Sequence, residues 1–345
     1  MRGRGLAAVM TGLVLAVALA GPAPADPPAH EPGGPCLEPG QQVSLSSLPS
    51  YEQVVRQLRS IESSSQGAVE VASAGQSGEG RQLYYATVGD GPDVFWLQSR
   101  IHGNELHSTE AALQVLRYLG SSGSPEAQRI RDELTVVVIP MYNPDGATAN
   151  IRQSTTPNRI DLNRDWENFA QPESRAFYAL WEQLRPRLAL DLHHFGQASR
   201  VVGTDELNNF QIGARSIDPS RMTAEQWLTN RQMAMISVDA VSRMGVAGVA
   251  RYPLIDITNA VLSRMLLGGP GPDGSDPGFM TQGAIFYEVR SVGQKSNGQL
   301  EQLFVRPSMA VLNAAADGSL YGHPGTGWDA LPFGQGVPCG GGPDF

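Results

Sequence analysis

The sequence predicts an α/β fold: a single domain built on a mixed, mostly parallel, twisted sheet with helices on both faces. Segments rich in β-branched residues alternate along the chain with segments whose apolar residues recur at helical spacing. This alternation is typical of a parallel sheet that is covered on both sides. The run ELTVVVIPMYN is apolar almost without a break, as expected of a strand buried on both faces. Because no internal repeat and no second apolar core is visible, we expect one domain.

The individual elements follow from periodicity and from turn residues. Helices are expected at about residues 50–65, 104–119, 171–184, 222–244 and 299–315, and strands at about 82–89, 93–103, 133–143, 187–196 and 283–291. The turn sequence GDGP separates the first two strands, so we expect these two to form a pair.

The first residues predict an exported protein. Arg2 and Arg4 precede the apolar run GLAAVMTGLVLAVALAG, which is followed by A-x-A sequences, the pattern of a secretory signal over residues 1–25. The run is shorter than a bilayer normally requires, so no membrane partner is expected after cleavage. The formal net charge is −9, and cleavage would make the chain still more acidic. A nucleic-acid partner is therefore excluded, and we take the secreted, extracellular chain to act as a monomer.

The mature chain divides by composition. Residues 26–45 are a Pro/Gly-rich leader, residues 46–318 carry the folded domain, and residues 319–345 are a Gly/Pro-rich tail that is expected to be loop-like. The two cysteines of the sequence, Cys36 and Cys339, lie near the two ends of the mature chain. Since an exported chain meets oxidising conditions, we predict one disulfide between them, with two unpaired thiols as the alternative.

The stretch SRIHGNELHSTEAAL contains two overlapping His-x-x-Glu spacings. His102 and Glu105 flank Gly103 at the carboxyl end of a predicted strand, where α/β sheets place their binding crevices. Glu105 is expected in the first turn of the next helix. His107 and Glu110 lie inside that helix and are expected to face solvent or a neighbouring helix. The first pair is therefore the candidate for a hydrolytic metal site, which commonly takes two His and one Glu and keeps a position for water.

The segment ALDLHHFG supplies the third candidate ligand. Strand alternation places Leu190 and Leu192 on one face, with Asp191 and His193 on the other. We predict His193 as the ligand, and His194 is the alternative.

The motifs HGNE, NPDG, DLNRDW, LDLHH and FYEVR follow one another in this order. Together they resemble the zinc carboxypeptidase family of the carboxypeptidase A type, over roughly residues 50 to 315. The resemblance implies that family's fold and one Zn²⁺ per chain. His102, Glu105 and His193 match the family's zinc ligands, and Asp161 matches the carboxylate that orients the first zinc His.

The resemblance also implies roles in catalysis and substrate binding. Glu288 matches the family's general base, and the alternative is a strand-end Glu that pairs with Arg290. Asn163 and Arg164 match the pair that holds the substrate's terminal carboxylate. Arg152 matches the arginine that polarises the scissile carbonyl.

Alternatives for this segment remain open. Arg159 is the rival to Arg152, and residues 152–165 could instead form a surface cluster of ion pairs.

The sequence also departs from the family pattern. The segment LLGGPGPDGSDPGFMTQG lacks the mobile active-site tyrosine, and Tyr252 lies too far upstream to align. Asn104 stands where digestive members often have Arg, so a preference for the terminal side chain is not implied. The formal G-x-G-x-x-G match GPGPDG contains two prolines and precedes no helix, which excludes a nucleotide site.

These observations predict an exported zinc metallocarboxypeptidase that hydrolyses C-terminal peptide bonds. Its substrate would be a peptide or small amide with a free carboxylate. The first alternative is a zinc amidohydrolase or deacylase acting on small N-acyl amino acids or cell-wall peptides. The second is a non-catalytic binding protein that kept the fold.

Overall fold

The computed structural model describes residues 48–195, 199–253, 255–290 and 296–336. All of them lie in one compact unit of the chain, Gly33–Phe345. The predicted signal and leader, together with Cys36 and Cys339, lie outside the described residues, so the disulfide stays a prediction.

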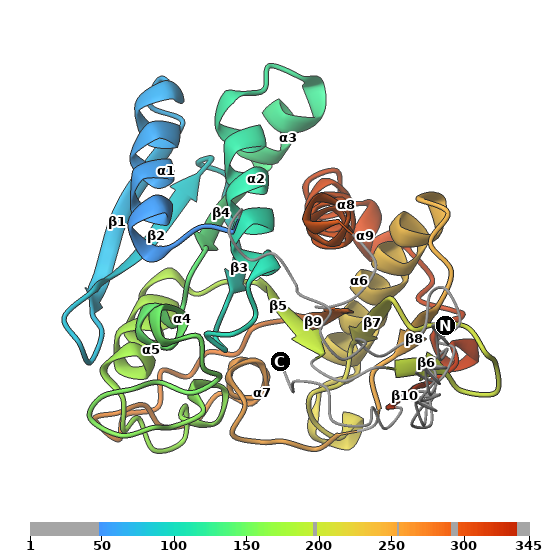
Figure 1. Cartoon of the computed structure of the whole chain (residues 1–345). Helices are drawn as coiled ribbons and strands as arrows, with labels where there is room; N and C mark the ends of the chain where they lie inside the picture. Colours follow the sequence, from blue (N-terminus) through green and yellow to red (C-terminus); the bar gives the residue numbers. More distant parts are fainter. Residues whose placement is uncertain (1–47, 196–198, 254, 291–295, 337–345) are drawn as a thin grey trace, which may run out of the picture. The chain divides into compact units, whose positions relative to one another are not determined.

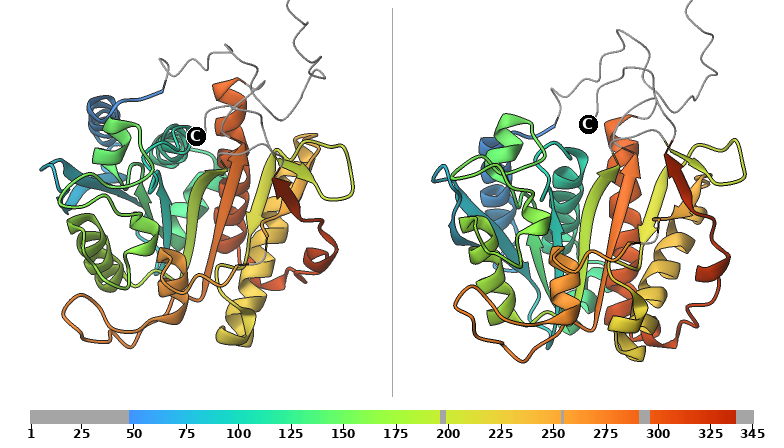
Figure 2. Two further views of the ribbon diagram at one scale, coloured as in Figure 1. Left: turned by 60° about the horizontal axis from the view of Figure 1, so that its bottom comes forward. Right: turned by 90° about the horizontal axis from the view of Figure 1, so that it is seen from below.

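An eight-stranded sheet in the order β1-β2-β4-β3-β5-β9-β7-β8 organises the domain. Its strands are β1 (Val69–Gln76), β2 (Gln82–Val88), β3 (Asp93–Ser99), β4 (Leu134–Ile139), β5 (Leu188–Phe195), β7 (Phe210–Gly213), β8 (Val249–Arg251) and β9 (Gly283–Arg290). The central strands β4, β3, β5 and β9 are parallel, whereas β1, β2 and β7 join the sheet in antiparallel pairs. Figure 2 shows β5, in yellow-green, beside β9, in orange. The predicted fold class is therefore confirmed.

Helices cover both faces of this sheet. They are α1 (Tyr51–Ser64), α2 (His107–Ser121), α3 (Pro125–Glu133), α4 (Pro144–Ala149), α5 (Pro172–Leu184), α6 (Ala224–Arg243), α7 (Val261–Leu267), α8 (Asn297–Ala316) and α9 (Ser319–Gly322), with 3₁₀ turns η1 (Leu162–Arg164), η2 (Pro219–Arg221) and η3 (Trp328–Ala330). Helices α1, α2, α3, α6 and α8 bury apolar side chains against one face, and α5 and α7 against the other (Figure 1). None of the helices in the described ranges is long and apolar enough to cross a membrane.

Local sequence explains where several helices begin. Ser50 and Gln53 form a capping box at the start of α1, and Thr223 and Gln226 do the same for α6. Pro172 occupies the first turn of α5, where its missing N–H costs nothing. These starts agree with the predicted helices.

The predicted pairing of the first two strands is wrong. Strand β4 lies between β2 and β3, and β2 pairs with β1 on its other side. The chain leaves β3 through α2 and α3 and returns as the parallel strand β4, a crossover that a parallel pair requires. The turn sequence GDGP therefore connects strands that belong to the same sheet without being neighbours.

The expectation of a loop-like tail is wrong for residues 319–336. Helix α9 buries Leu320, and η3 buries Trp328 among the apolar residues under α6 and α8. Strand β10 (Gly334–Gly336) pairs with β6 (Ser199–Val201) in a two-stranded sheet. Two large side chains that need burial outweigh the Gly and Pro content of this segment.

The buried central strands predict how stability responds to core truncation. Leu97 of β3 is 0% exposed, so Leu97→Ala should lower the free energy of unfolding by about 2–5 kcal/mol. Leu228 on α6 is 38% exposed, and Leu228→Ala should cost about 1 kcal/mol or less because little area is lost. Urea denaturation followed by circular dichroism measures both values. Equal losses in the two variants would contradict the placement of β3 in the centre.

Candidate metal centre and substrate pocket

The carboxyl ends of β3, β5 and β9 meet at one edge of the sheet, because these three strands are parallel neighbours. This edge is where open α/β sheets form their binding crevices. His102 and Glu105 lie in the loop that follows β3, His193 lies near the end of β5, and Glu288 lies near the end of β9.

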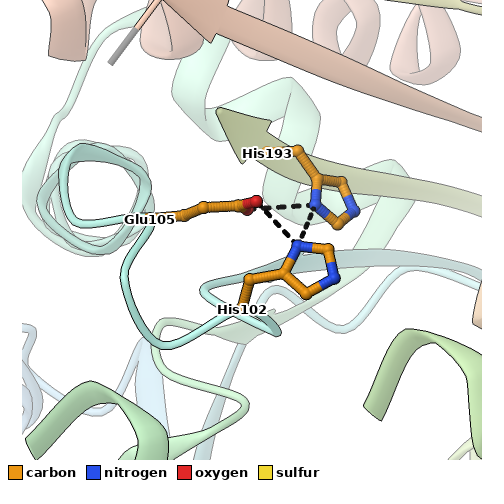
Figure 3. Close-up of side chains that lie close together, drawn as sticks. All are labelled: His102, Glu105 and His193. Carbon is orange, nitrogen blue, oxygen red and sulfur yellow. Dashed lines mark hydrogen bonds and ion pairs between the residues drawn. The ribbon is translucent and has the colours of Figure 1, made fainter. Parts of the chain in front are cut away.

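His102, Glu105 and His193 converge on one point, as Figure 3 shows. The Nδ1 atom of His102 lies 2.7 Å from Glu105 Oε1 and 3.1 Å from Nδ1 of His193. The Nδ1 atom of His193 lies 3.0 Å from Glu105 Oε2. All three side chains are buried, and together they form a possible metal site.

Two further carboxylates determine which nitrogen of each imidazole ring faces the cluster. His102 Nε2 lies 3.1 Å from Asp161 Oδ1, and His193 Nε2 lies 2.8 Å from Asp191 Oδ2. A carboxylate can only accept a hydrogen bond here, so each Nε2 carries the hydrogen and each Nδ1 turns its lone pair inward. Two lone pairs and a carboxylate that face one another in a buried place form a set of ligand atoms for a cation. The residues therefore fit a divalent metal ion with two His and one Glu as ligands.

The electrostatics of Glu105 favour its ionised form. Burial alone would raise the pKa of this carboxyl, but the nearby His102 and His193 outweigh burial and hold the pKa well below its usual range. Asp161 behaves similarly, since burial is outweighed by the hydrogen bond and charge of His102 and its pKa is lowered. Both groups are therefore anionic, as a ligand and its supporting carboxylate must be.

The loop that carries His102 and Glu105 depends on Gly103. A Cβ atom at Gly103 would lie 2.1 Å from the carbonyl carbon of Gly146 in α4, so any side chain would displace backbone. Glu105 itself precedes α2 by two residues, and the predicted position in the first helical turn is wrong. The reason is a tight turn, in which the Glu105 N–H donates to the His102 carbonyl at 3.1 Å and delays the start of the helix.

The other candidate ligands lie apart from this cluster. His107 Nε2 contacts Asn297 Oδ1 at 2.9 Å, and its ring stacks on His194 with 5.1 Å between centroids. Alternation along β5 directs His194 to the face opposite His193. Glu110 accepts a hydrogen bond from Gln57 at the surface of α1 and α2. As predicted, His107 and Glu110 do not join the metal cluster.

Glu288 lies on β9, the strand next to β5, and lines a cavity beside the metal cluster. It is paired in register with His193, so both side chains emerge on the same face of the sheet. Its Oε2 atom has no hydrogen-bond partner, and burial, with the charge of Glu105 adding to it, raises the pKa of Glu288 to about 7. A carboxyl of this kind is suited to accept and release a proton near neutral pH. The predicted alternative, an ion pair between Glu288 and Arg290, does not occur among the described contacts.

Three more predicted residues line a cavity of about 280 Å³ beside the cluster: Arg152, Asn163 and Arg164. Arg152 donates through Nε and Nη2 to Asp161 Oδ2 at 3.2 and 3.0 Å, which places the guanidinium next to the metal ligands. Arg164 Nη1 donates to the Asn163 carbonyl at 2.6 Å. Arg159, the rival to Arg152, does not line the cavity.

Tyr252 also lines this cavity, although its position in the sequence gave no reason to place it there. It follows the short edge strand β8, its N–H donates to the Ile212 carbonyl at 2.9 Å, and its ring meets Phe286 edge-on at 5.0 Å. Burial, with the charge of Glu288 adding to it, raises the pKa of Tyr252 to about 12, so the phenol is neutral. No local sequence pattern places this short strand at the cavity, so the sequence offers no signal for Tyr252.

The cavity also has an apolar part to its lining. Its apolar lining residues are Phe195, Ile255, Ile257, Ala260, Leu262 and Phe286. Ser216 adds a hydroxyl that is buried and has no hydrogen-bond partner. The acidic residues of the lining, Asp191 and Glu288, both lie beside the metal ligands.

Comparison with known proteins supports the resemblance. The model of the family described as "Zinc carboxypeptidase" matches residues 54–202. Carboxypeptidase 2 of Trichophyton rubrum is 25% identical over 202 residues, which are 57% of this chain and 37% of that protein. The catalytic chain of human carboxypeptidase N is 28% identical over 136 residues, 34% of this chain and 30% of that protein. The matched part of the chain thus spans about a third of the length of these relatives.

Solved structures show the same fold. Carboxypeptidase A from Helicoverpa armigera superposes with a TM-score of 0.61 at 17% identity, covering 81% of this chain and 76% of the other. A metallo-carboxypeptidase from Burkholderia cenocepacia gives a TM-score of 0.59 at 16% identity, covering 79% and 70%. The resemblance inferred from the five sequence motifs is therefore confirmed, and so is the carboxypeptidase-like fold.

The three-residue cluster predicts which histidine substitutions release the metal ion. Protein purified with zinc should retain about one ion per chain. His102→Ala and His193→Ala should each lose the zinc ion, because the two remaining protein ligands bind it more weakly. His107→Ala should keep the ion, because His107 contacts Asn297 and not the cluster. Elemental analysis after dialysis gives the zinc content, and loss of zinc from His107→Ala alone would contradict the ligand set.

Proposed function

We propose that this chain, which resembles the zinc carboxypeptidase family over residues 54–202, is an exported zinc metallocarboxypeptidase that removes C-terminal residues from peptides. One observation carries the proposal. Nδ1 of His102, Nδ1 of His193 and the Glu105 carboxylate converge at the carboxyl ends of the parallel strands. Glu288, Arg152 and Arg164 line the cavity at this place.

The residues around the cluster have complementary roles in amide hydrolysis. Zinc held by His102, Glu105 and His193 would polarise the scissile carbonyl. It would also lower the pKa of a neighbouring water molecule enough for that water to attack near neutral pH. Glu288 accepts the proton of the attacking water and passes it to the departing amine. Arg152 donates hydrogen bonds to the carbonyl oxygen as negative charge develops there.

Recognition of the chain end uses two further residues of the cavity lining, Asn163 and Arg164. The planar guanidinium of Arg164, with the amide of Asn163 beside it, suits a terminal carboxylate that accepts two hydrogen bonds. This arrangement supports cleavage of the last peptide bond over cleavage within a chain. The phenol of Tyr252 is a neutral donor that can bind the substrate backbone in the same space.

The apolar lining residues of the cavity support a preference for an apolar C-terminal side chain. A charged side chain would lose its hydration beside these residues, and the acids of the lining, Asp191 and Glu288, lie beside the metal ligands rather than free to pair with a Lys or Arg. Ser216 offers a single hydroxyl, which can satisfy one polar atom but not a charge.

Export belongs to the proposal on the grounds of Arg2, Arg4 and the apolar run that follows them. A domain that acts outside the cell meets peptides and exposed chain ends, the substrates that this cavity would accept. The proposed boundaries of the signal remain residues 1–25, and the proposed catalytic domain extends past its predicted end at residue 318, because Leu320 and Trp328 pack into its core.

Glu288→Gln should abolish turnover while zinc is retained. The amide keeps the size of the carboxyl but cannot take up a proton, so kcat should fall by about a hundredfold or more. Activity on a short peptide, measured beside zinc content, checks this. A variant with normal kcat would assign the base role to another group.

Arg164→Ala should weaken substrates with a free C-terminal carboxylate and spare amidated ones. Loss of a charge-assisted hydrogen bond predicts a decrease in kcat/KM of about ten- to a hundredfold for the free peptides. Matched peptides, free or amidated at the C-terminus, give the ratio. An equal decrease for both would favour the amidohydrolase alternative over the carboxypeptidase.

N-acylated dipeptides that differ only in the last residue should reveal the side-chain preference. Leu or Phe should exceed Gly, Lys and Glu by about ten- to a hundredfold in kcat/KM, because burying such a side chain contributes about 1.5–3 kcal/mol. Ser216→Asp should raise the relative rate for Lys by adding a carboxylate to the cavity lining. Faster cleavage of Lys by the unmodified protein would contradict the apolar preference but not the carboxypeptidase activity.

A further inference from the structure

The Asp of the NPDG motif has no place in the reaction described above, yet it is fully enclosed. Asp145 lies in α4, 1% exposed, and its carboxylate holds the turn between β1 and β2 (residues 77–81, here the β1–β2 turn). Its Oδ1 accepts from Ser77 Oγ at 2.8 Å and from Arg81 Nη1 at 2.7 Å. Its Oδ2 accepts from the Glu79 N–H at 2.8 Å. Every one of these bonds ends on the β1–β2 turn.

The β1–β2 turn in turn contacts the loop of residues 150–161. Glu79 Oε1 accepts from Thr155 Oγ1 at 2.6 Å. A Cβ atom on Gly78 would lie 1.9 Å from the Thr156 carbonyl oxygen, so the two backbones touch. Glu173 of α5 accepts from the Gly78 N–H at 3.2 Å and holds the turn from the other side. The loop is thus supported by a segment that lies about 75 residues earlier in the sequence.

This loop presents the guanidinium of Arg152. The Ser154 N–H donates to the Ile160 carbonyl at 2.9 Å, and the Ile160 N–H donates to Ser154 Oγ at 3.1 Å. These bonds close the loop and place Arg152 beside Asp161, to which it donates at 3.0 Å. Thr155, which the β1–β2 turn holds, directly follows the residue that closes the loop.

A stabilising ion pair alone would be the simpler interpretation of Asp145 and Arg81. Buried ion pairs contribute little net stability, however, and this carboxylate makes its contacts to a turn that itself contacts the loop of Arg152. We propose that Asp145 and the β1–β2 turn act as positioning residues that hold the Arg152 guanidinium against the reacting carbonyl. The inference rests on the proposed function, in which Arg152 stabilises the developing negative charge.

The test measures kcat and zinc content in single and double variants. Asp145→Asn should lower kcat by about ten- to a hundredfold, because small misplacement of a catalytic group has effects of that size. Thr155→Val removes only the hydroxyl that binds Glu79 and should lower kcat by about two- to tenfold. Both variants should retain zinc. Thr148→Val is the matched control, since its hydroxyl bonds within α4 and should leave kcat unchanged.

The decisive step repeats the two substitutions in an Arg152→Ala background. If they act through Arg152, their effects on kcat should vanish there, with ratios close to one. Undiminished ratios, or loss of zinc from Thr155→Val, would overturn the inference even if Asp145→Asn fails to fold. A protein that hydrolyses no peptide at all would instead overturn the proposed function, so the two failures are distinct.

Discussion

The structure depends on one electrostatic constraint: two imidazole lone pairs and a carboxylate must face one another inside the protein. His102 Nδ1 and His193 Nδ1 lie 3.1 Å apart, with Glu105 within 3.0 Å of both. Without a cation, such an arrangement would be relieved by rotating either ring. The carboxylates of Asp161 and Asp191 oppose rotation, because each accepts a hydrogen bond from the opposite ring nitrogen. The second layer of acids therefore creates the site as much as the ligands do.

The sheet satisfies this constraint by bringing together residues that are far apart in sequence. The parallel order β3-β5-β9 aligns the carboxyl ends of three strands, so His102, His193 and Glu288 reach one cavity without any long side-chain excursion. In-register pairing of His193 with Glu288 puts both on the same face. A one-residue shift of β5 would present His194 instead, and would turn the ligand toward the helices of the opposite face. The shift would also move Asp191 and His193 into the apolar cluster that now holds Leu190 and Leu192, and this cost excludes it.

Much of this arrangement could be predicted from the sequence, and the failures share a physical cause. Alternation along ALDLHHFG was enough to choose His193 over His194, because a buried strand has only two faces. The position of Tyr252 could not be predicted, since a short edge strand carries it into the cavity and no local pattern encodes where an edge strand docks. The order of β2, β4 and β3 was mispredicted for the same reason: local turn signals report that the chain reverses, not which strand becomes its neighbour.

The NPDG segment shows how a local motif can serve a distant site. Its turn chemistry is local, since Asn143 accepts from the Gly146 N–H at 2.9 Å and caps α4. The same Asn143 side chain also donates to the Arg152 carbonyl at 3.4 Å, and the missing side chain of Gly103 lets its loop approach the backbone of Gly146 in α4. Helix α4 therefore touches both the loop of the metal ligands and the loop of Arg152. Since a rigid body in contact with both loops fixes the distance between them, the geometry between metal and arginine is set by packing around α4 rather than by the spacing of either motif.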